Sequence, residues 1–251
     1  MYNGCLFVRS YFAYMSFINR YSSTSTDSAY RNEGLRMYMV KVFNYMAAAL
    51  GITGLTAFFV ASSPAMLSLL YQTPLQWVVM FAPVVFVIVF STRISGMTSE
   101  RAKVLFWCFS VLMGLSLSWV FIAYTGASIA RVFFIAATMF GAMAIYGNNT
   151  RTDLTGMGSF LTMGVVGILI AALVNVFLAS PAIYFAVSAL GVVIFTGLTA
   201  YDVQRIRDFY YFSVNADEET LSKIAVVGAL TLYFDFINIF ISLLNLMGER
   251  K

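Results

Sequence analysis

The sequence has no histidine and only two cysteines among its 251 residues. Without histidine the chain cannot form a Ser-His or Cys-His catalytic pair, a zinc site of the H-E-x-x-H type or an imidazole proton relay. The two cysteines, Cys5 and Cys108, provide neither a disulfide framework nor a metal-ligand spacing. Any proton chemistry in this protein therefore has to use carboxylates, lysine or tyrosine.

Charged residues are also scarce. They make up 10% of the chain, against about 25% in soluble domains, whereas hydrophobic residues make up 61%. This composition excludes a soluble globular protein and makes the lipid bilayer the expected partner. The formal net charge of +4 is scattered between apolar runs and forms no contiguous basic surface, so we expect no nucleic-acid partner.

Seven apolar segments are long enough to be membrane spans, and turn residues separate them. They cover approximately residues 40–62, 75–91, 104–124, 129–146, 157–179, 182–202 and 224–247. The sequence therefore predicts an all-α polytopic membrane protein, a bundle of seven transmembrane helices. We expect a disordered head at residues 1–36, the transmembrane domain at 37–248 and a short tail at 249–251. A six-span form with one re-entrant segment is the alternative.

The distribution of arginine and lysine predicts the orientation, because these residues resist translocation. They gather in the head and in the second, fourth and sixth loops: Arg9, Arg20, Arg31, Arg36, Arg93, Arg101, Lys103, Arg151, Arg205, Arg207 and Lys223. This pattern places the N-terminus in the cytoplasm. Seven spans then put Arg250 and Lys251 outside, against the rule.

Two aspartates lie in apolar surroundings, Asp202 near the end of the sixth segment and Asp235 within the seventh. A carboxylate at the centre of a span costs about 2.5 to 3.5 kcal/mol on insertion scales, so each is a candidate functional residue. Asp235 belongs to a helical stripe of small and polar residues, with Gly228, Thr231, Asn238, Ser242 and Asn245. A second stripe on the sixth segment consists of Ser188, Gly191, Thr199 and Asp202. Such stripes should face the protein interior, which predicts a central last helix.

The two aspartates can meet only if the helices extend beyond the apolar segments. The sixth helix would have to continue through Arg205, towards the aromatic run at 209–212, and the acidic cluster at 217–219 could start the seventh helix early. Two carboxyls within hydrogen-bonding reach do not both ionise without cost, so they would share a proton as a pH-sensitive latch. When ionised, they could offer oxygen ligands to calcium. The alternative is two isolated buried acids, each satisfied by a neighbouring Tyr, Asn or Arg.

The runs around these aspartates carry a resemblance to a known family. The run Thr-Ala-Tyr-Asp-Val-Gln-Arg-Ile at 199–206 and the run Leu-Tyr-Phe-Asp-Phe-Ile-Asn-Ile-Phe at 232–240 are similar to the transmembrane Bax inhibitor motif family. The resemblance implies seven helices with the last one central, an aspartate pair near the cytoplasmic side and a pH-sensitive calcium leak. It further implies a bacterial inner-membrane protein. Some members latch the pair with an arginine near the end of the second helix, for which Arg93 is the candidate, with Arg101 or an ordinary positive-inside role as alternatives.

Two other functions compete with a leak. An intramembrane aspartyl protease would use two such aspartates, but it also needs Gly-x-Gly-Asp and Pro-Ala-Leu motifs. Here Leu232, Tyr233 and Phe234 precede Asp235, and no proline follows Pro181. A non-conducting regulator that binds another membrane protein, such as a membrane protease, is the main alternative. The expectation is a pH-gated calcium or cation leak that is not an enzyme and has no cofactor, with Asp202 and Asp235 as its sensor pair and tentative calcium ligands.

Overall fold

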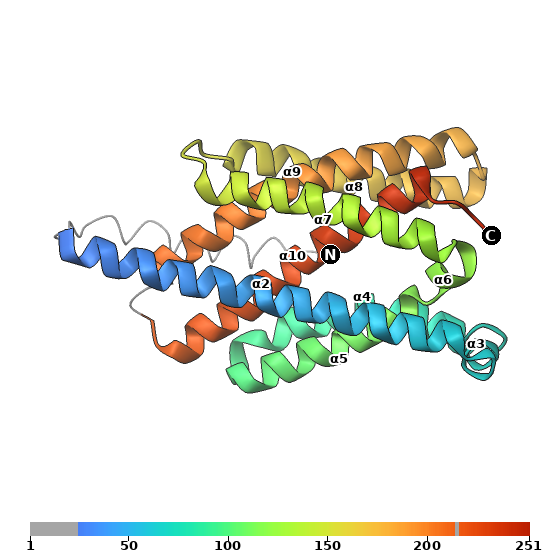
Figure 1. The fold of residues 1–251 in the computed structure, drawn as a ribbon, viewed down its shortest axis with the longest axis horizontal. Coiled ribbons are helices and arrows are strands. Elements are labelled where there is room, and N and C mark those ends of the chain that lie inside the picture. Colours follow the sequence, from blue (N-terminus) through green and yellow to red (C-terminus); the bar gives the residue numbers. More distant parts are fainter. Residues whose placement is uncertain (1–24, 214–215) are drawn as a thin grey trace.

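A computed structural model describes residues 25–213 and 216–251 (Figure 1). These residues form helices and one isolated β-bridge, between Tyr124 and Arg250, and no strand occurs in the described ranges. The elements are α2 (Ser25–Ser62), α3 (Pro64–Tyr71), α4 (Leu75–Arg93), the short 3-10 helix η1 (Ile94–Gly96), α5 (Ser99–Leu117), α6 (Trp119–Ala123), α7 (Gly126–Asn149), α8 (Thr155–Leu178), α9 (Pro181–Ser213) and α10 (Glu218–Met247).

Seven helical segments within the described residues are long and apolar enough to cross a membrane, which confirms the predicted fold class. They are α4, α7, α8, α9 and α10, the part of α2 from Glu33, and α5 continued by α6. Their surfaces carry many exposed apolar side chains, such as Phe160 and Phe177 on α8, as lipid contact requires. The start of α2 and the α4–α5, α7–α8 and α9–α10 connections lie at one end of the bundle, which we call the N-side, and the other end is the C-side.

Helix α10 is the central helix. Of its most apolar window, 61% is buried inside the protein, against 6% for α8. Figure 1 shows α10 crossing the bundle between a group formed by α7, α8 and α9 and a group formed by α2, α4 and α5. It contacts α9, α2, α7 and α5. The prediction of a central last helix is therefore confirmed.

The first helix begins before the first predicted span, within residues 1–36. Residues 1–24 lie outside the described residues, but residues 25–36 form the first turns of α2. The reason is tertiary packing, because Leu35 packs against the core and a side chain at Gly34 would collide with the Tyr210 hydroxyl of α9. The part of the head that the structure describes is thus the start of the first span's helix, and disorder of the head as a whole stays a prediction.

The two helices that carry the aspartates have the extensions that the sequence suggested. Helix α9 continues eleven residues past Asp202, to Ser213, and α10 begins at Glu218. The side chain of Asp217 caps α10 by accepting a hydrogen bond from the Thr220 amide at 3.2 Å. A tight hairpin joins α8 to α9 at the C-side, where Ala179 adopts a left-handed conformation with φ 48°.

Candidate functional site: an aspartate pair between α9 and α10

Asp202 on α9 and Asp235 on α10 lie side by side in the interior of the bundle. Their exposed fractions are 8% and 5%, and the two carboxyls interact with one another. A hydrogen bond between them requires a proton on one carboxyl, because two carboxylates are both acceptors. Oδ2 of Asp235 is buried and receives no donor from any described residue. Two carboxyls buried this close together are more stable when they share a proton than when both are ionised.

Small residues allow the two helices to approach one another on both sides of the pair. A Cβ added at Gly191 of α9 would lie 2.6 Å from the Ser242 hydroxyl oxygen, and one at Gly228 of α10 would lie 3.2 Å from the Ile206 side chain. Close helix contact through small residues is common in membrane bundles. Gly191, Gly228 and Ser242 of the predicted stripes therefore lie at the contact between α9 and α10.

Three polar members of the stripes form hydrogen bonds within their own helices. Thr231 donates to the Val227 carbonyl, Asn238 to the Phe234 carbonyl and Thr199 to the Phe195 carbonyl, at 3.1, 2.8 and 2.8 Å. These bonds satisfy the side chains without the aspartates. A supporting role for Thr199, Thr231, Asn238 and Ser242 in ion passage stays a prediction.

The basic side chain that interacts with Asp202 lies on the same helix, α9. Arg205, three residues further along α9, interacts electrostatically with Asp202 and places its guanidinium 5.2 Å from the centre of the Phe209 ring. Arg93 lies exposed in the last turn of α4, and no hydrogen bond or ion pair joins it to either aspartate in the part of the chain that the structure describes. Its role as a latch stays a prediction.

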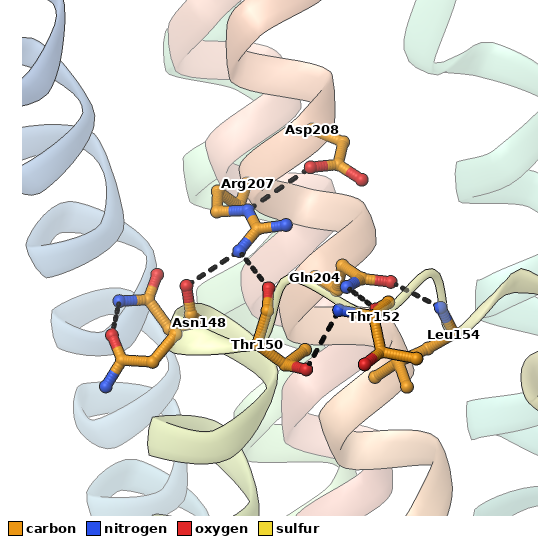
Figure 2. Close-up of polar contacts among 8 residues, drawn as sticks. Asn148, Thr150, Thr152, Leu154, Gln204, Arg207 and Asp208 are labelled. Carbon is orange, nitrogen blue, oxygen red and sulfur yellow. Dashed lines mark hydrogen bonds and ion pairs between the residues drawn. The ribbon is translucent and has the colours of Figure 1, made fainter.

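Two residues that the sequence analysis did not select bind the α7–α8 loop next to the pair. The amide of Gln204, buried two residues beyond Asp202, accepts a hydrogen bond from the Leu154 N–H and donates one to the Thr152 carbonyl, both at 2.8 Å. Arg207 donates to the carbonyls of Asn148 and Thr150 at 2.7 and 3.2 Å. Figure 2 shows both side chains reaching from α9 to the loop backbone. These four bonds fasten the loop to the turn of α9 that follows Asp202.

The other face of α10 is fixed by a buried hydroxyl network. Thr53 of α2 donates to the Ser110 carbonyl of α5 at 2.9 Å and lies 2.9 Å from the Tyr233 hydroxyl. Because the single Thr53 proton is used by Ser110, Tyr233 is the donor in the second bond. Tyr233 is fully buried two residues before Asp235. The network therefore ties α10 to α2 and α5 at the level of the aspartate pair.

At the C-side the last residues of the chain bind the start of α7. The Thr125 N–H donates to the Glu249 carbonyl, the Glu249 N–H to the Ser128 hydroxyl and the Lys251 N–H to the Ala123 carbonyl, at 3.0, 2.9 and 3.0 Å. Arg131 forms an ion pair with the Glu249 carboxylate at 3.4 Å. We call residues 248–251 the C-terminal strap, because they hold the end of α10 against α7.

The aspartate pair could contact a cation in transit but is a poor fit for a resident one. Calcium takes about six to eight oxygen ligands, and two carboxyls supply only part of that shell. Across the described residues, no three acidic or cysteine side chains come together in a way that would hold a metal ion. Water or backbone oxygens would therefore have to complete the coordination of a cation at Asp202 and Asp235.

Comparisons with known proteins give the family. Residues 35–251 match the family model described as "Inhibitor of apoptosis-promoting Bax1". The chain is 44% identical to uncharacterized protein RP147 of Rickettsia prowazekii, over 92% of this chain and 96% of that protein. It is 42% identical to the Escherichia coli inner membrane protein YbhL, over 87% of this chain and 94% of that protein. The match covers all seven membrane-spanning segments and both aspartates, and the chain belongs to the Bax inhibitor family of membrane proteins.

Proposed function

We propose that this protein is a pH-gated cation leak, with calcium as its transported ion, and that Asp202 and Asp235 form the proton sensor. The observation that carries the proposal is the buried carboxyl pair between α9 and the central α10, in which Oδ2 of Asp235 has no donor among the described residues. A buried carboxyl oxygen without a donor is costly, and an ionisable residue inside a membrane helix is by default a candidate functional residue. We propose no catalytic role and no cofactor for the pair.

In the proposed mechanism a shared proton closes the leak. The proton bridges the carboxyls of Asp202 and Asp235 and holds α9 against α10, whereas its loss leaves two adjacent negative charges that repel one another. The repulsion loosens the contact at the pair, and the ionised oxygens then attract a divalent cation. Flux should therefore rise as the pH rises.

For the location, we propose a bacterial inner membrane with the N-side in the cytoplasm. The relative named YbhL is an inner membrane protein, which supports the choice of membrane. Four exposed arginines, Arg36, Arg93, Arg101 and Arg151, lie at the N-side, against Arg131 and Arg250 at the C-side, and this excess is what the positive-inside rule requires of a cytoplasmic face. At the C-side the Lys251 ammonium donates to the Phe121 carbonyl at 2.7 Å, so it is engaged by the protein.

The test is calcium flux into vesicles that contain only the purified protein and lipid, measured across about pH 5 to 8. The native chain is compared with Asp202→Asn and Asp235→Asn, which keep the side-chain volume and remove the charge. We expect the native flux to vary with pH and both variants to lose that dependence. Asp208→Asn is the matched control, because Asp208 lies on the same helix and pairs with Arg207 at 3.2 Å, away from the aspartate pair.

One result would reject the leak, and two others would reject the sensor role of the aspartates. Native vesicles that take up no more calcium than empty ones at any pH would leave a regulator that binds another membrane protein as the better proposal. A pH dependence that survives in both aspartate variants would remove the sensor role from the pair. If Asp208→Asn alters the pH dependence of the calcium flux as much as Asp202→Asn does, the effect arises from surface charge.

A further inference from the structure

An open groove lies on the N-side surface where α4 passes into α5. Its volume is about 590 Å³. It combines basic, acidic and apolar side chains from the last turn of α4, the connection and the first turns of α5, namely Arg93, Gly96, Met97, Glu100, Arg101, Val104 and Leu105. Neither Asp202 nor Asp235 lines the groove, and the proposed leak makes no use of it.

The charges in the groove favour an anion. Arg93 and Arg101 are exposed, and neither guanidinium has an ion pair with a described residue. The one acidic residue of the groove, Glu100, is already paired, because its carboxylate lies 2.6 Å from the Lys103 ammonium. Three cations and one anion leave the cluster with a formal charge of +2. Two free guanidiniums can bind a phosphate group through several charge-assisted hydrogen bonds.

The position of the groove favours a phosphate that belongs to a lipid. Arg93 ends the α4 span and Arg101 stands in the first turn of α5, so both guanidiniums lie where hydrocarbon meets the headgroup layer. Val104, one turn further into the bilayer from Arg101, lines the groove and is 58% exposed, and Val89 is exposed one turn before Arg93. An acyl chain would cover these side chains, which a soluble phosphate would leave bare. The N-terminus of α5 adds a partial positive charge at the same place.

We propose that this groove is a binding site for an anionic phospholipid, with the lipid phosphate between Arg93 and Arg101 and an acyl chain along Val104. The site holds a lipid at the cytoplasmic leaflet, on the face of the bundle opposite the α7–α8 loop. It does not depend on the proposed leak, since a non-conducting protein would bind the same lipid.

The experiment is native mass spectrometry of the full-length protein in detergent with equal amounts of phosphatidylglycerol and phosphatidylcholine. We expect one phosphatidylglycerol to be retained in preference to phosphatidylcholine. Because each basic residue near an anionic surface contributes roughly a fivefold factor, the double variant Arg93→Gln with Arg101→Gln should weaken that binding by about thirtyfold. The matched control is Arg36→Gln with Arg151→Gln, which removes two exposed N-side arginines outside the groove and changes the net charge equally.

Three results would overturn the site. A native protein that retains both lipids equally has no anionic-lipid site, whatever the variants do. If the groove variant and the control variant lose phosphatidylglycerol binding equally, the lipid is attracted to the positive N-side surface in general and not to the groove. Displacement of the bound lipid by an excess of inorganic phosphate would show that the groove recognises a free anion and that the acyl chain contributes nothing.

Discussion

The hydrogen bonds of Gln204 give the sharpest test of how the α7–α8 loop is held. Gln204→Ala removes the oxygen that accepts from the buried Leu154 N–H and the N–H that donates to the Thr152 carbonyl. A buried polar group left without a partner costs about 1 to 3 kcal/mol, and the second, less buried bond adds about 0.5 to 1.5 kcal/mol. We therefore expect the free energy of opening the loop to fall by about 3 kcal/mol, and the Leu154 amide to exchange about a hundredfold faster.

The measurement is hydrogen exchange of a peptide covering residues 150–156, in the purified protein. Asn148→Ala is the control, because the Asn148 side chain bonds only to its neighbour Asn149 and Arg207 uses its backbone carbonyl. The control should exchange like the native chain. If the Leu154 amide is equally protected in Gln204→Ala and the native protein, the Gln204 amide does not hold the loop and the reasoning fails.

A second variant, Gln204→Glu, separates the two bonds. An ionised Glu still accepts from the Leu154 N–H but faces the Thr152 carbonyl with no donor, whereas a protonated Glu supplies both partners. Folding then favours the protonated form, so the variant should regain protection as the pH falls and lose it as the pH rises. Gln204→Ala has no such group and should stay unprotected at every pH. A Gln204→Glu protein without this pH dependence would contradict the assignment of donor and acceptor.

Three further predictions concern the fold. Ala179→Gly should raise stability by about 0.5 to 1 kcal/mol in thermal unfolding, because a left-handed residue with a Cβ is strained at φ 48°; no gain would mean that the strain is relieved elsewhere. Gly114→Ala should destabilise by about 1 to 3 kcal/mol, because its Cβ would lie 2.7 Å from the Thr53 carbonyl oxygen, whereas Gly126→Ala meets open space and should not. Hydrogen bonds from Thr220 lower the pKa of the exposed Asp217, so its stabilising effect should be present at neutral pH and lost as the pH falls through that lowered value. Asp217→Asn should show a weaker acid dependence of the thermal midpoint, and an unchanged one would refute the assignment.

The sequence could predict the spans and the central helix because those features depend on local composition. A run of about 20 apolar residues is a membrane span wherever it occurs, and the alternating three- and four-residue spacing around Asp235 fixes one helix face. The extension of α9 past Asp202 could also be predicted, since the aromatic run at 209–212 continues the apolar pattern.

The loop contacts could not be predicted, because they join side chains to backbone atoms far away in sequence. Gln204 and Arg207 bind carbonyl and amide groups of residues 148–154, and a backbone group has no sequence signature. The sequence signal for Gln204 is an amide side chain two residues after Asp202, inside the Tyr-Asp-x-Gln run. The C-terminal strap is similar, because Glu249 and Lys251 contact residues 121–131 mainly through main-chain atoms. The position of Arg93 beside Arg101 likewise follows from the turn at η1, not from residue types.

These contacts constrain how the proposed gate could move. Tyr233 ties α10 to α2 and α5, and the C-terminal strap holds its end, so α10 is the less mobile of the two helices. Asp202 lies on α9, but Gln204 fastens the following turn to the α7–α8 loop. Repulsion between the carboxyls must therefore either carry that loop with α9 or break the bonds of Gln204 and Arg207. Gln204→Ala removes two of these four bonds, so it should make the calcium flux rise at a lower pH than in the native protein, and a flux profile unchanged by Gln204→Ala would mean that α9 does not move at the gate.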